Sequence, residues 1–208
     1  MTESTIHSLV IAHASLGGLA LFSGLIALIT KKGSKPHRMG GKVFFWSLLF
    51  SGCLALLVAS LPGHESPFLF AIGIFSIYLI LTGYLALRYK NPETNLLLDK
   101  IISAVMIVTG IFMIIVPVLQ SGQINIVLTV FGSIGISLAI QDLKLFRNKE
   151  KLQKGWLISH LGKMIGGYIA ATTAFIVVNQ FFPPLIGWIG PTVVGTIFII
   201  YWSRKVSR

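Results

Sequence analysis

The sequence predicts an all-α bundle of seven transmembrane helices, and two observations lead to this fold class. The first is a series of seven long apolar stretches, and the second is where the basic residues lie between them. A helix that crosses about 30 Å of hydrocarbon needs roughly 20 apolar residues, and each stretch approaches that length. The predicted spans are residues 8–30, 43–61, 68–87, 101–119, 124–140, 156–181 and 185–202.

The positions of the basic residues predict the topology. Apart from Lys163, which lies inside the sixth stretch, the 17 lysines and arginines follow only the first, third, fifth and seventh stretches. The gaps at 62–67, 120–123 and 183–184 contain none. Short loops rich in Lys and Arg stay in the cytoplasm. We therefore expect the N-terminus outside the cell and the C-terminus in the cytoplasm.

Composition supports the membrane class and argues against nucleic-acid binding. The chain is 54% hydrophobic, and the spans with their short loops use nearly all of residues 1–208, so we expect a single integral membrane domain. The formal net charge is +11. Because the basic residues are spread over short segments beside the membrane, topology and anionic lipid head groups explain them, and we predict no nucleic-acid partner.

The ends of the spans carry the expected markers. Backbone groups in lipid need internal partners, so the spans must be helices. Pro36 is expected to open the second helix and to place His37 and Arg38 in its first turn. The other prolines are expected to start or end helices at the outer side of the membrane; they are Pro62, Pro67, Pro117, Pro183, Pro184 and Pro191. The single cysteine, Cys53, is interpreted as a small buried residue.

Two spans carry a histidine followed along its own helical face by small side chains. In the first span these are His13, Gly17, Ala20 and Gly24. In the sixth span they are His160, Met164, Gly167, Ala171 and Ala174. Such a face leaves room beside the helix for a neighbouring aromatic side chain or for a flat cofactor. A second face of the sixth span has small-xxx-small spacing, at which another helix can approach closely; it consists of Gly162, Gly166 and Ala170.

The predicted topology sorts the histidines into two layers. His7, His13 and His64 belong to the outer side, and His37 and His160 to the inner side. Two ligands per layer is what b-type haem needs, so a haem-binding redox protein that exchanges electrons with a quinone is our first functional hypothesis. His13 with His64 and His37 with His160 are the simplest ligand pairs. Met164 is an alternative ligand to His37, and Arg38 a partner for a propionate or a lipid head group.

A polar cluster is expected at the inner side of the membrane. Asp142 closes the fifth span and is the carboxylate near a membrane boundary. It is expected to pair with Lys163 or Arg38, or to accept a hydrogen bond from His160, because a charge at that depth needs a partner or water. Considered alone, Lys163 is expected to extend its amine toward the membrane surface.

Two further functional hypotheses remain open. A small-solute or proton-coupled transporter would use Asp142, His160 and Lys163 as an inner gate and would need a water-accessible cavity that reaches Asp142. A non-catalytic component that assists assembly of a membrane complex would use the same groups only to join helices. Hydrolase motifs such as HExxH and GxSxG are absent from the sequence. Zinc needs three or four clustered ligands. The outer set of His7, His13, His64 and Glu65 is a thin candidate for binding or transporting a metal, and we predict no metal centre.

Several segments resemble the bacterial predicted membrane proteins of the domain of unknown function 2306 family. The loop after the first span contains the H-R-x-x-G pattern of that family as His37, Arg38 and Gly41. The sixth span resembles its H-x-x-x-M-x-x-x-Y-I-x-x-x-T-A-F pattern; the matching residues are His160, Met164, Tyr168, Ile169, Thr173, Ala174 and Phe175. His13 and Asp142 resemble family positions in the first and fifth spans.

The resemblance covers more than half of the chain, and it implies a multi-pass protein of a bacterial inner membrane. It brings no reaction with it. It directs attention to a short set of residues, His13, His37, Arg38, Gly41, Asp142, His160 and Met164.

Overall fold

The computed structural model describes residues 2–206, with residues 184 and 185 described by their backbone alone. Seven α-helices and one short 3-10 helix, η1, account for nearly all of this part of the chain, and it contains no strand. The elements are α1 (Glu3–Ile29), α2 (Lys35–Val58), α3 (Pro67–Leu85), η1 (Ala86–Arg88), α4 (Leu97–Ser121), α5 (Ile126–Leu145), α6 (Lys149–Val178) and α7 (Pro184–Val206). All seven of these α-helices are long and apolar enough to cross a membrane, so the predicted fold class is confirmed.

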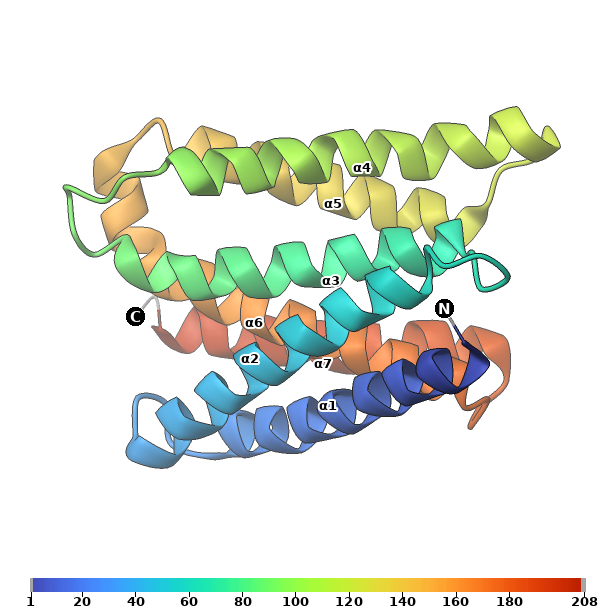
Figure 1. Ribbon diagram of the computed structural model, residues 1–208. Coiled ribbons are helices and arrows are strands. Elements are labelled where there is room, and N and C mark those ends of the chain that lie inside the picture. Colours follow the sequence, from blue (N-terminus) through green and yellow to red (C-terminus); the bar gives the residue numbers. More distant parts are fainter. Residues whose placement is uncertain (1, 207–208) are drawn as a thin grey trace.

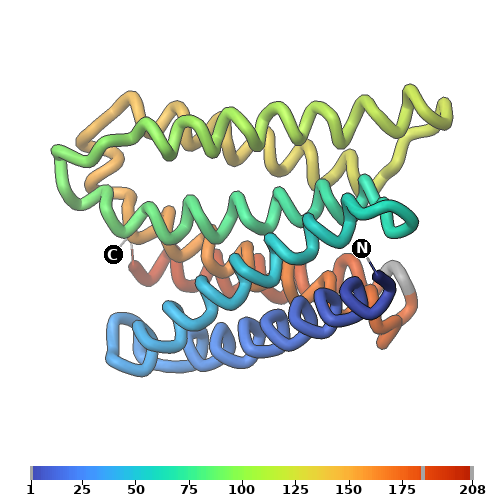
Figure 2. Tube along the Cα trace, in the orientation of Figure 1, coloured from blue at the N-terminus to red at the C-terminus, as the bar shows by residue number. Residues whose placement is uncertain are grey.

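Successive helices run in opposite directions, so the loops alternate between the two ends of the bundle (Figure 1). The α1–α2, α3–α4 and α5–α6 loops and the last turn of α7 lie together at one end, which we call the basic end because it carries the clusters of Lys and Arg. The tube in Figure 2 shows the start of α1 at the opposite end. Helix α1 therefore begins at one end of the bundle and α7 finishes at the other, as an odd number of spans requires.

Helices α3 and α6 form the centre of the bundle. Helix α3 contacts α2, α4, α5 and α6, and helix α6 contacts α1, α3, α5 and α7. The two helices approach closely at Gly83, where an added Cβ would lie 3.1 Å from the backbone nitrogen of Met164. A second close approach lies at Gly167, which faces the side chain of Ile80. Glycine at these positions lets the two backbones come together as larger residues would not.

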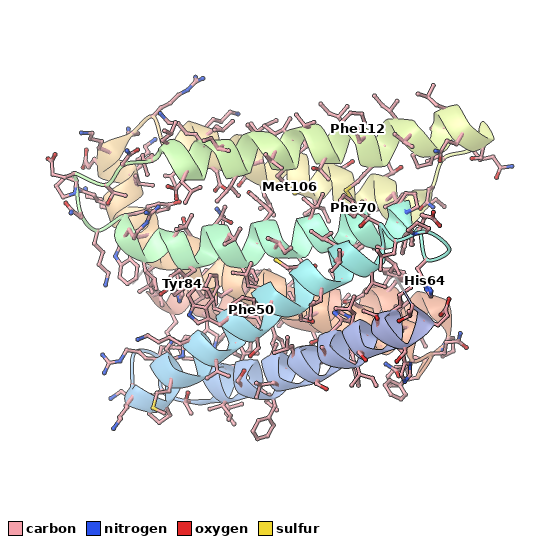
Figure 3. The ribbon with its side chains drawn as sticks, viewed as in Figure 1. Phe50, His64, Phe70, Tyr84, Met106 and Phe112 are labelled. Atoms are coloured by element: carbon pink, nitrogen blue, oxygen red, sulfur yellow. The ribbon has the colours of Figure 1, made fainter. Side chains whose placement is uncertain are left out.

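The outer surface of the bundle is apolar, as a lipid-facing surface must be. Along α4, Met106 is fully buried and points into the bundle, whereas Phe112 is 60% exposed and points away from it (Figure 3). Phe22 on α1 and Leu119 on α4 are also largely exposed. The protein therefore has apolar side chains both inside and outside, which is typical of a membrane bundle and not of a water-soluble domain.

Most of the helices are longer than the apolar stretches because polar residues extend and cap them; α3, with 19 residues, is not. Thr2, Ser34 and Asn148 each accept a hydrogen bond from a backbone N–H in the first turn of α1, α2 and α6. This side-chain acceptor satisfies a donor that has no partner within the helix. As a result α6 begins at Lys149, seven residues before the predicted start.

Some local predictions hold and others are wrong. Pro36 does open α2, with His37 and Arg38 in its first turn. Pro117 lies inside α4 and Pro191 inside α7, so these two prolines do not mark helix ends. Cys53 is exposed on the outside of α2, so its interpretation as a buried residue is wrong.

Candidate functional site

An ion pair and a tyrosine form a buried cluster near the basic end, where three helices meet. Lys163 of α6 donates from Nζ to Oδ1 of Asp142 of α5 across 2.5 Å. Tyr78 of α3 donates from its hydroxyl to Oδ2 of the same carboxylate across 2.7 Å. Lys163, Asp142 and Tyr78 are 7%, 4% and 2% exposed. Both carboxylate oxygens are therefore satisfied, as a charge buried in this environment requires.

This geometry selects among the partners expected for Asp142. The structure pairs it with Lys163, whereas Arg38 is exposed at the start of α2 and His160 donates elsewhere. The expectation that Lys163 extends to the membrane surface is wrong, because its amine turns inward to Asp142. Tyr78 was not predicted, since nothing in an apolar stretch distinguishes a packing tyrosine from a hydrogen-bonding one.

A second carboxylate held between a tyrosine and a cation lies where the α3–α4 connection meets the start of α4. Asp99, in the first turn of α4, is fully buried. Its Oδ1 accepts from the Tyr89 hydroxyl across 2.8 Å, and its Oδ2 accepts from Arg88 across 2.9 Å. The expectation that Asp142 is the single carboxylate in such a cluster is therefore wrong. Asp99 was missed because its partners lie in a loop whose path the sequence does not specify.

The environment of Tyr89 shows that the two clusters are neighbours. Burial raises the pKa of the Tyr89 hydroxyl above its ordinary value, and the negative charges of Asp99 and then Asp142 raise this pKa further. The positive charge of Arg88 acts in the opposite direction. The basic end thus contains two carboxylates, each held between a tyrosine hydroxyl and a cation.

Three histidines share one hydrogen-bonding arrangement, in which Nδ1 faces a backbone carbonyl of another helix. His13 Nδ1 lies 2.9 Å from the carbonyl oxygen of Ser51, and His160 Nδ1 lies 2.8 Å from that of Gly83. His37 Nδ1 lies 2.8 Å from the carbonyl oxygen of Ala27. Because a carbonyl can only accept, Nδ1 carries the hydrogen at His37 and His160. At His13 the same assignment fits the Ser51 hydroxyl, which lies 2.9 Å from Nδ1 and donates to the His13 carbonyl. In the neutral ring this leaves Nε2 as the nitrogen with a lone pair.

The four histidines predicted as haem ligands are not equivalent in the structure. His37 and His160 lie within electrostatic range of each other near the basic end. His64, in the α2–α3 loop, is exposed, and its Nε2 lies 4.0 Å from Glu3 and not beside His13. Met164 packs among apolar residues of α2, α3 and α6. His37 bonds to α1 and His160 to α3, and among the described residues no hydrogen bond or ion pair joins the members of either predicted pair.

Protein side chains already occupy the small-residue faces beside His13 and His160. An added Cβ on Gly24 would lie 2.7 Å from the Tyr168 ring and 2.9 Å from the Phe44 ring. The corresponding atom on Gly167 would lie 2.5 Å from Ile80. Of the two expectations for these faces, the structure therefore favours packing by neighbouring side chains over space for a flat cofactor.

The other face of α6 borders a cleft of about 1090 Å³ between α5, α6 and α7, with α3 as its floor. Gly162, Gly166 and Ala170 border this cleft. The predicted helix packing holds for part of this face, because Leu79 of α3 would lie 3.5 Å from a Cβ on Gly166 and Ala170 is buried in the same cluster as Leu79. An added Cβ on Gly162 would meet no atom within 4 Å. The remaining walls come mostly from apolar residues, including Phe75, Leu79, Val130, Phe131, Leu138, Ile158, Trp188, Ile189 and Ile199.

Eight of the 25 residues that line the cleft are polar: Gln141, Asp142, Ser159, Lys163, Thr173, Thr192, Thr196 and Ser203. Asp142 and Lys163 border it toward the basic end, together with Ser159 and Ser203. Thr173 borders it farther along α6, is 2% exposed, and its hydroxyl has no hydrogen-bond partner among the described residues. The buried hydroxyls of Ser103, Thr129 and Thr172 share this property, so it does not single out the cleft.

The fold and these sites define a multi-pass integral membrane protein with buried polar clusters near one end. Comparison with protein-family models, with curated proteins and with solved structures finds no match to this chain. The resemblance to the domain of unknown function 2306 family therefore stays a prediction. Within residues 2–206, no three His, Cys, Asp or Glu side chains are grouped as a metal site would require.

Proposed function

We propose that this membrane protein binds a lipid-soluble molecule in the α5–α6–α7 cleft and that Asp142 and Lys163 recognise its polar group. The observation that carries the proposal is an apolar cleft that ends at a buried ion pair. Ligand pockets are typically apolar, with a few polar groups that orient the ligand, and this cleft has that composition.

The rim of the cleft supports entry of the ligand from the bilayer. Ile126, Val130 and Ile134 of α5 line the cleft and are 75%, 49% and 44% exposed, and Ile189 of α7 is 48% exposed. These side chains belong to the lateral, lipid-facing surface of the bundle. A molecule dissolved in the membrane can therefore reach the cleft without passing through water.

The polar end of the cleft has hydrogen-bond donors to offer. A protonated lysine carries three N–H groups, and Asp142 takes one of them. Tyr78 occupies the second oxygen of Asp142, so the carboxylate is the less available member of the pair. A ligand with an oxygen acceptor can use the free N–H groups of Lys163 without breaking the pair.

This function is a modified form of the transport hypothesis. A small water-soluble solute would need a polar path, whereas most residues that line this cleft are apolar and its charged residues are confined to the Asp142–Lys163 pair. We therefore infer that the molecule bound or carried is lipid-soluble. We further propose a bacterial inner membrane as the location, with the basic end in the cytoplasm, on the grounds of the Lys and Arg distribution.

Photolabelling of the purified protein with a small diazirine-bearing hydrocarbon tests this function. We expect labelling of peptides from α5, α6 and α7 that border the cleft. Gly162→Trp should abolish it by filling the cleft from a position where a Cβ meets nothing. The matched control is Gly18→Trp, because Gly18 lies on α1, away from the cleft, and its Cβ would also meet nothing. Equal labelling of the cleft peptides in both variants would refute the proposal.

A b-type haem bound by histidines is the second candidate, and the common arrangement of His13, His37 and His160 supports it. Histidines that bind metals almost always donate their other ring N–H to a carbonyl or carboxylate, as these three do. The filled faces beside His13 and His160 count against it, which is why this function comes second. Reduced-minus-oxidised spectra of protein produced with added haem test it, and a featureless spectrum would exclude it.

The third hypothesis, a non-catalytic assembly component, makes a different prediction for the same protein. Asp142→Asn and His160→Ala would then lower the amount of folded protein without altering photolabelling or spectra. Measuring abundance and cleft labelling in the same membranes separates this hypothesis from ligand binding.

A further inference from the structure

We propose that the molecule in the cleft is an isoprenoid quinone, with its ring at the Asp142–Lys163 end and its tail along the apolar walls. This inference rests on the proposed function, and it adds the chemical class of the ligand. Three properties of the cleft support it: its length, the balance of charge at its polar end and the depth of that end in the membrane.

The length of the cleft favours a single long chain. Its lining runs along α6 from Ile158 to Thr173 and along α7 from Trp188 to Ser203, which is 15 steps from residue to residue on each helix. At 1.5 Å per residue this is about 22 Å. One leaflet contributes only about 15 Å of the hydrocarbon thickness, so a chain that fills the cleft passes the middle of the bilayer. Isoprenoid tails are long enough to pass the middle of the bilayer, whereas the acyl chains of one leaflet end near that middle.

The charge at the polar end favours a neutral head group. Asp142 and Lys163 neutralise each other, and both are more than nine-tenths buried. An anionic head group in contact with this pair would add a buried charge that no further cation balances, which is costly. The carbonyl oxygen of a quinone can instead accept a free N–H of Lys163. Ser159 and Ser203 border the same region and provide further hydroxyl groups.

The depth of Lys163 in the membrane suits a small uncharged ring. Lys163 lies seven residues beyond Trp156 on α6, which is about 10 Å along the helix. Tryptophan is enriched at the level of the head groups, where the phosphate of a phospholipid stays. A quinone ring is small and uncharged, so it can enter the hydrocarbon region as far as Lys163.

Competition with the diazirine photolabel tests this inference in the purified full-length protein. Long-tailed ubiquinone should suppress labelling of the cleft, whereas phosphatidylglycerol at equal concentration should not. The double variant Asp142→Asn/Lys163→Met keeps the shape of the pair but removes the Lys163 donor. It should need about tenfold more ubiquinone for the same suppression, as expected for loss of a hydrogen bond from a charged group.

The outcomes separate this inference from the function on which it rests. Suppression by phosphatidylglycerol and not by ubiquinone would overturn the quinone assignment and leave lipid-phase binding intact. An unchanged ubiquinone requirement in the double variant, with its unfolding temperature preserved, would overturn the placement of the ring at Lys163. Cleft labelling that Gly162→Trp fails to reduce would overturn both the function and the ligand class.

Discussion

Lys163 and Asp142 form an ion pair at 2.5 Å within the apolar part of a membrane bundle, and both side chains are more than nine-tenths buried. The pair joins α6 to α5 at the polar end of the cleft. Tyr78 adds α3 to the same cluster through the second carboxylate oxygen. Helices α3, α5 and α6 therefore all depend on one carboxylate at this level of the bundle.

Removing the charge of only one member of this pair should destabilise the protein. Asp142→Asn leaves a buried ammonium without its counter-ion, a change that typically costs about 3–5 kcal/mol. We expect a clearly lower midpoint of thermal unfolding in detergent and less folded protein in the membrane. The double variant Asp142→Asn/Lys163→Met removes both charges and should recover most of the loss, since the amide oxygen of the new side chain can still accept from Tyr78. A double variant no more stable than Asp142→Asn would show that the charge balance is not the cause.

The close approach of α3 and α6 at Gly83 predicts a strong position-specific effect. Gly83→Val would place a Cβ 3.1 Å from the backbone nitrogen of Met164, which cannot move aside alone. Overpacking of this kind costs about 1–3 kcal/mol. Gly18→Val is the matched control, because its Cβ meets no atom within 4 Å. Thermal unfolding of the two variants checks the prediction, and similar midpoints for both would contradict it.

Substitutions at His160 separate a structural role from a ligand role. His160→Ala removes the donor to the Gly83 carbonyl and should cost about 1 kcal/mol. His160→Asn keeps a nitrogen donor near the position of Nδ1, so it should recover part of that stability. Neither variant retains Nε2, so any function that needs this nitrogen, including metal or haem ligation, should be lost in both. Unfolding midpoints of these variants measure the structural role of His160, and optical spectra of the same samples measure its role as a ligand.

Tyr89 should make the protein less stable at high pH. Burial raises its pKa in the folded state, whereas in the unfolded chain it loses its proton near pH 10. Above that pH the folded state binds more protons than the unfolded state, so the free energy of unfolding falls as pH rises. Below about pH 10 both states hold the proton and the contribution is fully present. Tyr89→Phe should therefore show a shallower loss of stability above about pH 10, as measured by unfolding at a series of pH values, and parallel curves would contradict this.

The orientation in the membrane is open to a direct test. Once Cys53 is replaced by serine, Gln123→Cys and Glu93→Cys place single exposed thiols at opposite ends of the bundle. The positive-inside rule predicts that a membrane-impermeant maleimide labels Gln123→Cys in intact cells and labels Glu93→Cys only after the membrane is opened. The reverse pattern would invert the proposed topology.

The predicted and observed helices differ for reasons that are physical. The apolar stretches locate each span because hydrocarbon excludes charged residues, and this requirement acts on every residue of a span. Helices α1 and α6 begin before their apolar stretches because the capping residues Thr2 and Asn148 are polar and give no hydropathy signal. Pro117 and Pro191 lie within helices, although proline usually marks an end.

The candidate site was predictable only in part. Asp142, Lys163 and His160 were identifiable because ionisable residues are rare inside a membrane span. Asp99 gave no such signal, since it lies in the first turn of α4 beside a polar loop. Tyr78 was also missed, because a tyrosine within a span is common and its hydrogen-bond partner lies 64 positions away.

By itself, the sequence determined that the chain is a seven-helix membrane protein, because hydrophobicity is a property of each stretch taken alone. It also predicts which end faces the cytoplasm, since the loop charges can be counted without a fold. Only the tertiary structure decided which face of α6 packs and which borders the cleft. Both faces carry glycine and alanine, so the difference depends on where Ile80 and Leu79 of α3 lie against Gly167 and Gly166. Packing depends on the positions of neighbouring helices, and no single span contains that information.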